Sequence, residues 1–117
     1  MGVWERDLET GVARWSAGVR RLLGLDDRDP VPPLQERMGW VHPDDRRRVA
    51  DSHLRALEGE AADITFRVIP ADGVLRTVRT HVFRGYFDRP RMVCGVVVDV
   101  TSSLESERAN SATLSMF

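Results

Sequence analysis

Residues 62–100 decide the fold, and they read ADITFRVIPADGVLRTVRTHVFRGYFDRPRMVCGVVVDV. Within them Ile64, Phe66 and Val68 alternate with polar residues, a pattern that predicts a half-buried strand. Turn residues at 70–73 and 88–91 separate this strand from two more predicted strands, over 74–86 and 92–100. Because tight turns join all three, they are expected to be antiparallel neighbours in one sheet. The nearly continuous apolar run at 92–100 is typical of a central strand that is covered on both faces.

The first half of the chain predicts two strands, over residues 3–8 and 12–15. Three or four short helices are expected after them, within 17–23, 34–41 and 43–59. Gly11 lies in the turn of the first hairpin, and Ser16 is a candidate N-cap for the first helix. Asp44 and Asp45 are expected to face the positive end of the dipole of the third helix. A capping box at 102–105 predicts another helix that runs toward residue 117. This arrangement of strands and helices gives an α+β fold.

The composition fits one globular domain, with 117 residues of which 42% are hydrophobic and 30% charged. The net charge of −1 gives no field that would attract nucleic acid or an anionic membrane, although all 17 basic residues are arginine. Neither a leader peptide nor an apolar run of ~20 residues is present, so a cytoplasmic location is expected. The single cysteine, Cys94, excludes an internal disulfide and a cysteine-based zinc site, and is expected to be a small buried hydrophobe.

Several short motifs follow one another in a characteristic order. They are Trp4-Glu5-Arg6-Asp7-Leu8, Glu9-Thr10-Gly11, Trp15-Ser16, Leu22-Leu23-Gly24, Val41-His42-Pro43-Asp44-Asp45, Asp72-Gly73, and the stretch GVVVDVT at 95–101. In their order and spacing they closely resemble the PAS/PAC family of sensory domains, in the group with a W-x-x-D opening and a V-H-P-D-D helix start. The resemblance implies a PAS fold, in which short helices are cupped over one face of a five-stranded antiparallel sheet.

The resemblance also implies a domain organisation. The PAS domain would span residues 1–101, with its PAC half at about 62–101, and a signalling or linker helix would start within 102–117. Such a domain is a sensory or signal-relay module of a longer bacterial signalling protein, with an output domain after it. In the family, an Asp-hydrophobe-Thr triplet couples the last strand to the following helix. Asp99-Val100-Thr101 matches this triplet, so the resemblance implies a signal-coupling role for Asp99 and Thr101. No catalytic triad, P-loop or Rossmann fingerprint is present, so the domain itself is not expected to be an enzyme.

Strand parity and helical spacing give a candidate ligand pocket between cup and sheet. The residues expected to line it are Ile64, Phe66, Val68, Val78, Val82, Val93, Val97, Leu54 and Leu57. Nearly all of them lack hydrogen-bonding groups, so we expect a small apolar ligand or none. Cys94, Val96 and Val98 have the opposite parity, and with the region around Val3 they form the expected homodimer surface on the outer sheet face.

Two cofactors occur in the family, and the residues at their positions predict neither of them. Flavin-binding relatives carry a reactive cysteine in the helix that corresponds to 34–41, and place Asn, Asn and Gln where this chain has Val68, Val78 and Val97. Valines cannot hydrogen-bond a flavin, so no flavin is expected. His53 lies on the helix that carries the haem histidine in some PAS sensors, although Val49 aligns with that position. A haem-based gas sensor and a purely structural interaction domain with a filled pocket remain alternatives; no other metal site is expected.

Overall fold

The computed structural model describes residues 1–85 and 91–102. Its elements are β1 (Gly2–Asp7), β2 (Ala13–Trp15), α1 (Ala17–Leu22), α2 (Leu34–Trp40), the 3-10 helix η1 (Pro43–Asp45), α3 (Arg46–Leu57), β3 (Ala62–Val68), β4 (Arg76–Arg84) and β5 (Met92–Asp99). Their order confirms the sequence prediction, although β4 is shorter than expected at both ends. Thr101 and Ser102 are helical, and the helix predicted beyond them lies outside the described residues.

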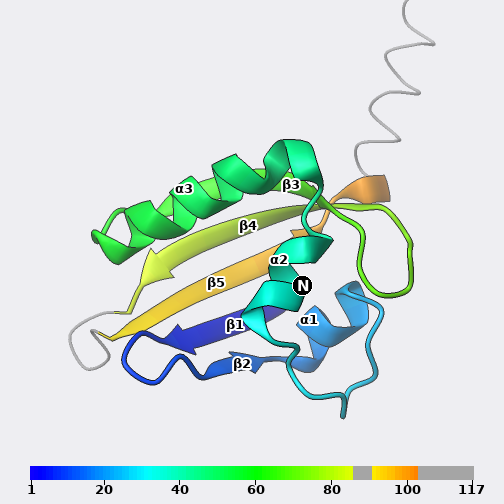
Figure 1. Ribbon diagram of the computed structural model, residues 1–117, viewed down its shortest axis with the longest axis horizontal. Helices are drawn as coiled ribbons and strands as arrows, with labels where there is room; N and C mark the ends of the chain where they lie inside the picture. Colours follow the sequence, from blue (N-terminus) through cyan, green and yellow to red (C-terminus); the bar gives the residue numbers. More distant parts are fainter. Residues whose placement is uncertain (86–90, 103–117) are drawn as a thin grey trace, which may run out of the picture.

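The strands form one antiparallel sheet in the order β2-β1-β5-β4-β3 (Figure 1). β5 is central, because it pairs with β1 on one side and with β4 on the other. Val96 of β5 therefore lies between Val3 of β1 and His81 of β4. The first and last strands of the sequence are thus neighbours. The N-terminal hairpin, β1 and β2, extends the sheet formed by β3, β4 and β5. This arrangement confirms the predicted five-stranded α+β fold.

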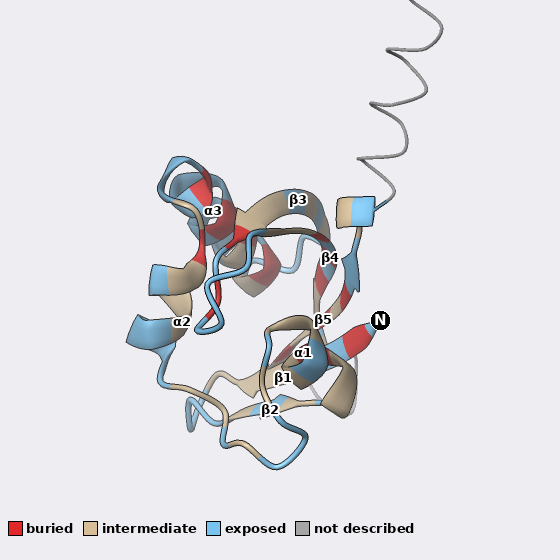
Figure 2. Cartoon of the chain, turned by 90° about the vertical axis from the view of Figure 1, so that its right-hand side faces the viewer, coloured by how far each residue is buried: buried red, intermediate tan, exposed pale blue. Residues whose placement is uncertain are grey.

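The described helices cover one face of this sheet (Figures 1 and 2). On α3 the buried residues Val49, Ser52 and Ala56 follow helical spacing, which turns one face of the helix toward the strands. Ala56 packs with Val82 and Val93 in a core cluster whose three members are at most 1% exposed. A second cluster joins α1 to the sheet, and its buried members are Val19, Val68, Val78 and Val97.

Burial alternates along β5, which corrects one expectation. Val93 and Val97 face the helices and are buried, whereas Val96 is half-buried and Val98 is 40% exposed. The central position of this strand was predicted correctly, but the expected cover on both faces is wrong for the described residues. The apolar run arises because valines occupy the outer-face positions as well, so the outer face of the sheet carries an open apolar strip.

Asp45 lies at the helix start, as predicted, and has a further role there. Asp44 is exposed, but Asp45 is buried and its carboxylate accepts hydrogen bonds from two arginines. The Arg67 backbone N–H, Nε and Nη2 donate at 2.9, 3.0 and 2.9 Å, and Arg48 Nη2 donates at 3.1 Å. These bonds lower the pKa of Asp45 well below its ordinary value, against the opposing effect of burial. Asp45 therefore fastens the start of α3 to β3.

Ser16 joins α1 to the sheet instead of capping the helix with its side chain. It occupies the N-cap position, but its hydroxyl accepts a hydrogen bond from the Val3 N–H at 2.9 Å. Gly18 approaches the first strand so closely that a Cβ there would overlap the Met1 carbonyl oxygen. The first helix is therefore fixed tightly over the start of β1.

None of the helices in residues 1–85 and 91–102 combines the length and apolar character needed to cross a membrane.

Candidate ligand-binding site

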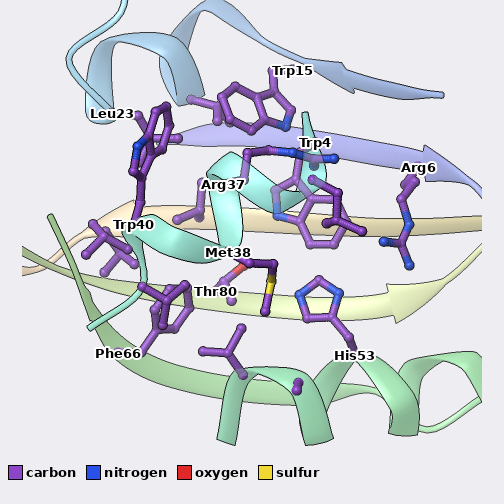
Figure 3. A pocket seen from close by; sticks show the side chains of 18 of the residues that line it. Trp4, Arg6, Trp15, Leu23, Arg37, Met38, Trp40, His53, Phe66 and Thr80 are labelled. Carbon is purple, nitrogen blue, oxygen red and sulfur yellow. The ribbon is translucent and has the colours of Figure 1, made fainter. Parts of the chain in front are cut away.

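A cavity of about 440 Å³ lies between the helices and the inner face of the sheet (Figure 3). Residues from β1, β2, α1, α2, α3 and the last three strands all contribute to its wall. Its large aromatic side chains are Trp4, Trp15, Trp40 and Phe66. Its size falls within the range of about 300–1,000 Å³ that is typical of small-molecule sites. The cavity therefore has both the position and the size of a ligand pocket.

Most of the predicted pocket residues meet at this cavity. Those that line it are Phe66, Val68, Val78, Val97, Leu54 and Leu57. Val82 and Val93 have the expected parity but lie outside the lining, because Ala56 packs directly against them in the core. Ile64 is half-buried and also lies outside the lining. Whether the six lining residues contact a ligand stays a prediction.

Trp4 and His53 stack on each other in the cavity wall. Their ring centroids are 5.5 Å apart and their planes differ by 15°. Trp4 lies opposite Gly95 in the β1–β5 register, and a Cβ on residue 95 would overlap the indole. Glycine at this position therefore gives the Trp4 ring room over β5. Burial, helped by the charges of Arg6 and Arg37, lowers the pKa of His53 and so favours its neutral form.

Sequence reasoning missed two cationic side chains in the cavity wall, Arg6 of β1 and Arg37 of α2. The Arg37 guanidinium carbon lies 5.7 Å from the centre of the Trp15 ring. Its Nε is buried and has no hydrogen-bond partner among the described residues. Both positions could have been found, because Arg6 shares strand parity with Trp4 and Arg37 follows Leu34 by three residues on the cup helix.

Thr101 and Asp99, the predicted signal-coupling pair, make different kinds of contact. Thr101 Oγ1 accepts a hydrogen bond from the Thr77 N–H at 2.8 Å, and the Val100 N–H donates to the Thr77 carbonyl at 2.9 Å. Together these bonds join the end of β5 to the start of β4. Asp99 is exposed, and its Oδ1 accepts a local bond from the Thr101 N–H at 2.9 Å. The cross-strand connection therefore belongs to Thr101, and Asp99 supports its backbone.

Metal-ligating side chains do not gather anywhere in the described part of the chain, where no three of His, Cys, Asp or Glu lie close enough to hold an ion. Within that part, His53 is the one imidazole that lines the cavity. Cys94 is half-buried on the outer face of the sheet, opposite Phe83 and Glu5, and is thus less buried than expected. The polar side-chain groups that the lining offers a cofactor are those of His53, the two arginines and Thr80, and the indole N–H groups of the three tryptophans.

Comparison with known proteins agrees with this geometry. A family model described as PAS fold matches residues 12–97. The chain is 29% identical over 112 residues to the sensor protein FixL of Bradyrhizobium diazoefficiens, which covers 93% of this chain and 22% of that protein. It is 30% identical over 115 residues to a blue-light-activated histidine kinase of Brucella ovis, which covers 98% of this chain and 23% of the kinase.

A solved structure, a sensory box histidine kinase/response regulator from Burkholderia thailandensis, has the same fold. It matches with a TM-score of 0.76 at 24% identity, over 98% of this chain and 88% of that one. The chain spans less than a quarter of the length of the two sensor proteins above, at 22% and 23%. The family match, the sheet order and the cupped helices lead to one conclusion: this chain belongs to the PAS fold family.

Proposed function

We propose that this PAS domain is the sensory module of a longer signalling protein, and that it responds to a small molecule bound in the cavity under the helices. The observation that carries the proposal is the cavity of about 440 Å³. Protein interiors are close-packed and hold few voids larger than a water molecule. A space of this size therefore argues against the alternative of a structural domain whose pocket is filled by side chains.

The donor groups in the cavity do not suit a flavin. Val68, Val78 and Val97 all line it, and they stand where flavin-binding relatives are expected to offer amides. The polar edge of the flavin would be buried against these valines without hydrogen bonds, which is costly.

Haem is the other cofactor to consider. His53 favours it, because the lowered pKa keeps the imidazole in the neutral form that binds iron.

Native mass spectrometry and an absorption spectrum of the purified chain test the proposal. We expect a bound small molecule without a flavin or Soret band. Val97→Phe should narrow the cavity and weaken or remove the adduct, whereas Val96→Phe on the outer face of the same strand is the matched control and should retain it. A wild-type protein without adduct, which Val97→Phe destabilises by overpacking, would favour the filled domain. A Soret band would favour haem.

The proposal includes a path from the cavity to a partner domain. The PAS domain would comprise residues 1–101, with its PAC half at about 62–101, and 102–117 would begin the linker to an output domain. Thr101, supported by Asp99, would couple the sheet to that linker. Any enzymatic activity would belong to the output domain, as the kinase names of the relatives support. We further propose a cytoplasmic location, and a homodimer formed through the open apolar face of the sheet.

A further inference from the structure

The cavity contains two positive charges for which the described part of the protein supplies neither a counter-ion nor a hydrogen-bond acceptor. Neither Arg6 nor Arg37 forms an ion pair or a side-chain hydrogen bond with any described residue, and the described residues that line the cavity include no Asp or Glu. Half-buried arginines elsewhere do have acceptors. They are Arg20 with two backbone carbonyls, Arg67 with Asp45, and Arg76 with Asp72.

Leaving these two guanidinium groups in the cavity without an acceptor opposes the stability of the empty domain. Burial, with the charge of Arg6, lowers the pKa of Arg37, because both disfavour the charged form of the side chain. The Trp15 ring attracts that cation but cannot accept the buried Nε–H in the way an oxygen does. An unpaired polar group of this kind in a native protein calls for an explanation, and a bound anion would supply the missing acceptor.

The charged and apolar parts of the wall occupy different ends of the cavity. Figure 3 shows Arg6 and His53 toward one end and Leu23, Trp40 and Phe66 toward the other, with the Arg37 side chain extending toward Trp4. The charges of Arg6 and Arg37 act on each other and on His53, which places the three groups near one another. A ligand that matches this wall needs a negative charge at one end and an apolar body at the other.

We propose that the cavity binds a small organic anion, a carboxylate or phosphate monoester whose charge lies against Arg6 and Arg37 and whose apolar body extends toward Trp40 and Phe66. This inference rests on the proposed sensory function, and it replaces the apolar ligand expected from the sequence with an amphipathic one. Guanidinium groups suit either head group, because their paired N–H donors match the oxygens of carboxylate and phosphate.

Calorimetric titration of the whole chain with three compounds that share one ring system tests the proposal. The compounds are 2-naphthoate, 2-naphthyl phosphate and the neutral 2-naphthamide. At least one anion should bind roughly 10-fold or more tightly than the amide, and the stronger of the two identifies the head group. Arg6→Gln and Arg37→Gln should each weaken anion binding roughly 10- to 100-fold without weakening the amide. Arg55→Gln, an exposed position on α3 outside the cavity, is the matched control and should bind like wild type.

A second measurement does not depend on the choice of ring. Without ligand, Arg37→Met should raise the melting temperature, because it removes an unsatisfied buried cation while keeping a similar aliphatic stem. A lower melting temperature would overturn the inference by making Arg37 a structural residue. Equal binding of the amide, or a neutral adduct that co-purifies with the chain, would overturn the anionic ligand and leave the sensory function standing. Failure of all three compounds, with no co-purified adduct, would overturn both.

Discussion

At the scale of single residues, Asp45 holds two parts of the chain together. Its side chain is 5% exposed, while those of Arg67 and Arg48 are 40% and 56% exposed. We expect Asp45→Asn to lower the free energy of unfolding by about 1–3 kcal/mol at neutral pH, because it removes charge-assisted bonds from a buried position. The exposure of the two arginines keeps the effect below that of a fully buried pair. Urea unfolding at pH 7 measures it.

The pH dependence of this effect follows from the direction of the pKa shift. The pKa of Asp45 is lower in the folded protein than in the unfolded chain, so its stabilisation is complete above about pH 5 and declines as the pH falls further. The deficit of Asp45→Asn should therefore shrink between pH 5 and pH 2. Asp63→Asn breaks the exposed pair with Arg79 and is the matched control, with little effect expected. Equal losses in the two variants at pH 7 would contradict the buried role of Asp45.

The same residue shows what sequence patterns can and cannot predict. Proline followed by two aspartates predicted the start of a helix correctly, because those preferences act within one turn. The pairing of Asp45 with Arg67 joins residues 22 positions apart and depends on how α3 packs on β3. The arginines of the cavity were missed for another reason. A search for apolar residues of one strand parity finds the valines but not Arg6, although Arg6 has the same parity as Trp4 on its strand.

At the scale of elements, the end of β5 depends on one hydroxyl. Thr101→Val keeps the shape of the side chain but leaves the Thr77 N–H without its acceptor. We expect a loss of about 1–2 kcal/mol in the free energy of unfolding, and faster amide exchange at Thr77 and Thr101 while the amide of Val82, in the middle of the sheet, stays protected. Hydrogen exchange followed by NMR measures this difference.

Two further variants separate the roles of Thr101 and Asp99. Thr101→Ser keeps the hydroxyl and should behave like wild type. Asp99→Asn keeps an oxygen that can accept from the Thr101 N–H, so its effect should be smaller than that of Thr101→Val. An exchange pattern in Thr101→Val that matched wild type at Thr77 would remove this strand end from the proposed signal path. A larger effect of Asp99→Asn would return the main role to the carboxylate.

Element positions were predicted well where a period repeats, and less well where packing decides. Alternation over Ile64, Phe66 and Val68 predicted β3, and the turn residues around it predicted an antiparallel neighbour. The same apolar character gave no information on which face of β5 would be covered, because valines stand on both. Val82 and Val93 were assigned to the pocket by parity alone. They lie outside the lining because Ala56 of α3 packs directly against them in the core.

At the scale of the whole molecule, the sheet separates two surfaces of different character. The inner face carries the cavity, and β5 takes part in both faces because successive side chains point to opposite sides. On the outer face Val3 is 51% exposed and Val98 is 40% exposed, and Val96 lies between them. An apolar strip across the centre of a sheet is typical of a surface that contacts a partner. Val97 lines the cavity, and its neighbours Val96 and Val98 lie on the outer face. A displacement of β5 caused by a ligand would therefore move the apolar strip as well.

The last prediction follows from this open strip. Val3→Asp should shift the chain from dimer to monomer, because a carboxylate at the centre of an apolar interface loses its hydration without gaining a partner. Val74→Asp is the matched control, since Val74 is also 51% exposed but lies in the connection between β3 and β4. Sedimentation velocity over a concentration series should show dimers for the wild type and for Val74→Asp, and monomers for Val3→Asp. If the wild type stays monomeric at the highest concentration, the outer face is not a homodimer surface. Dissociation of both variants would attribute the effect to added charge in general.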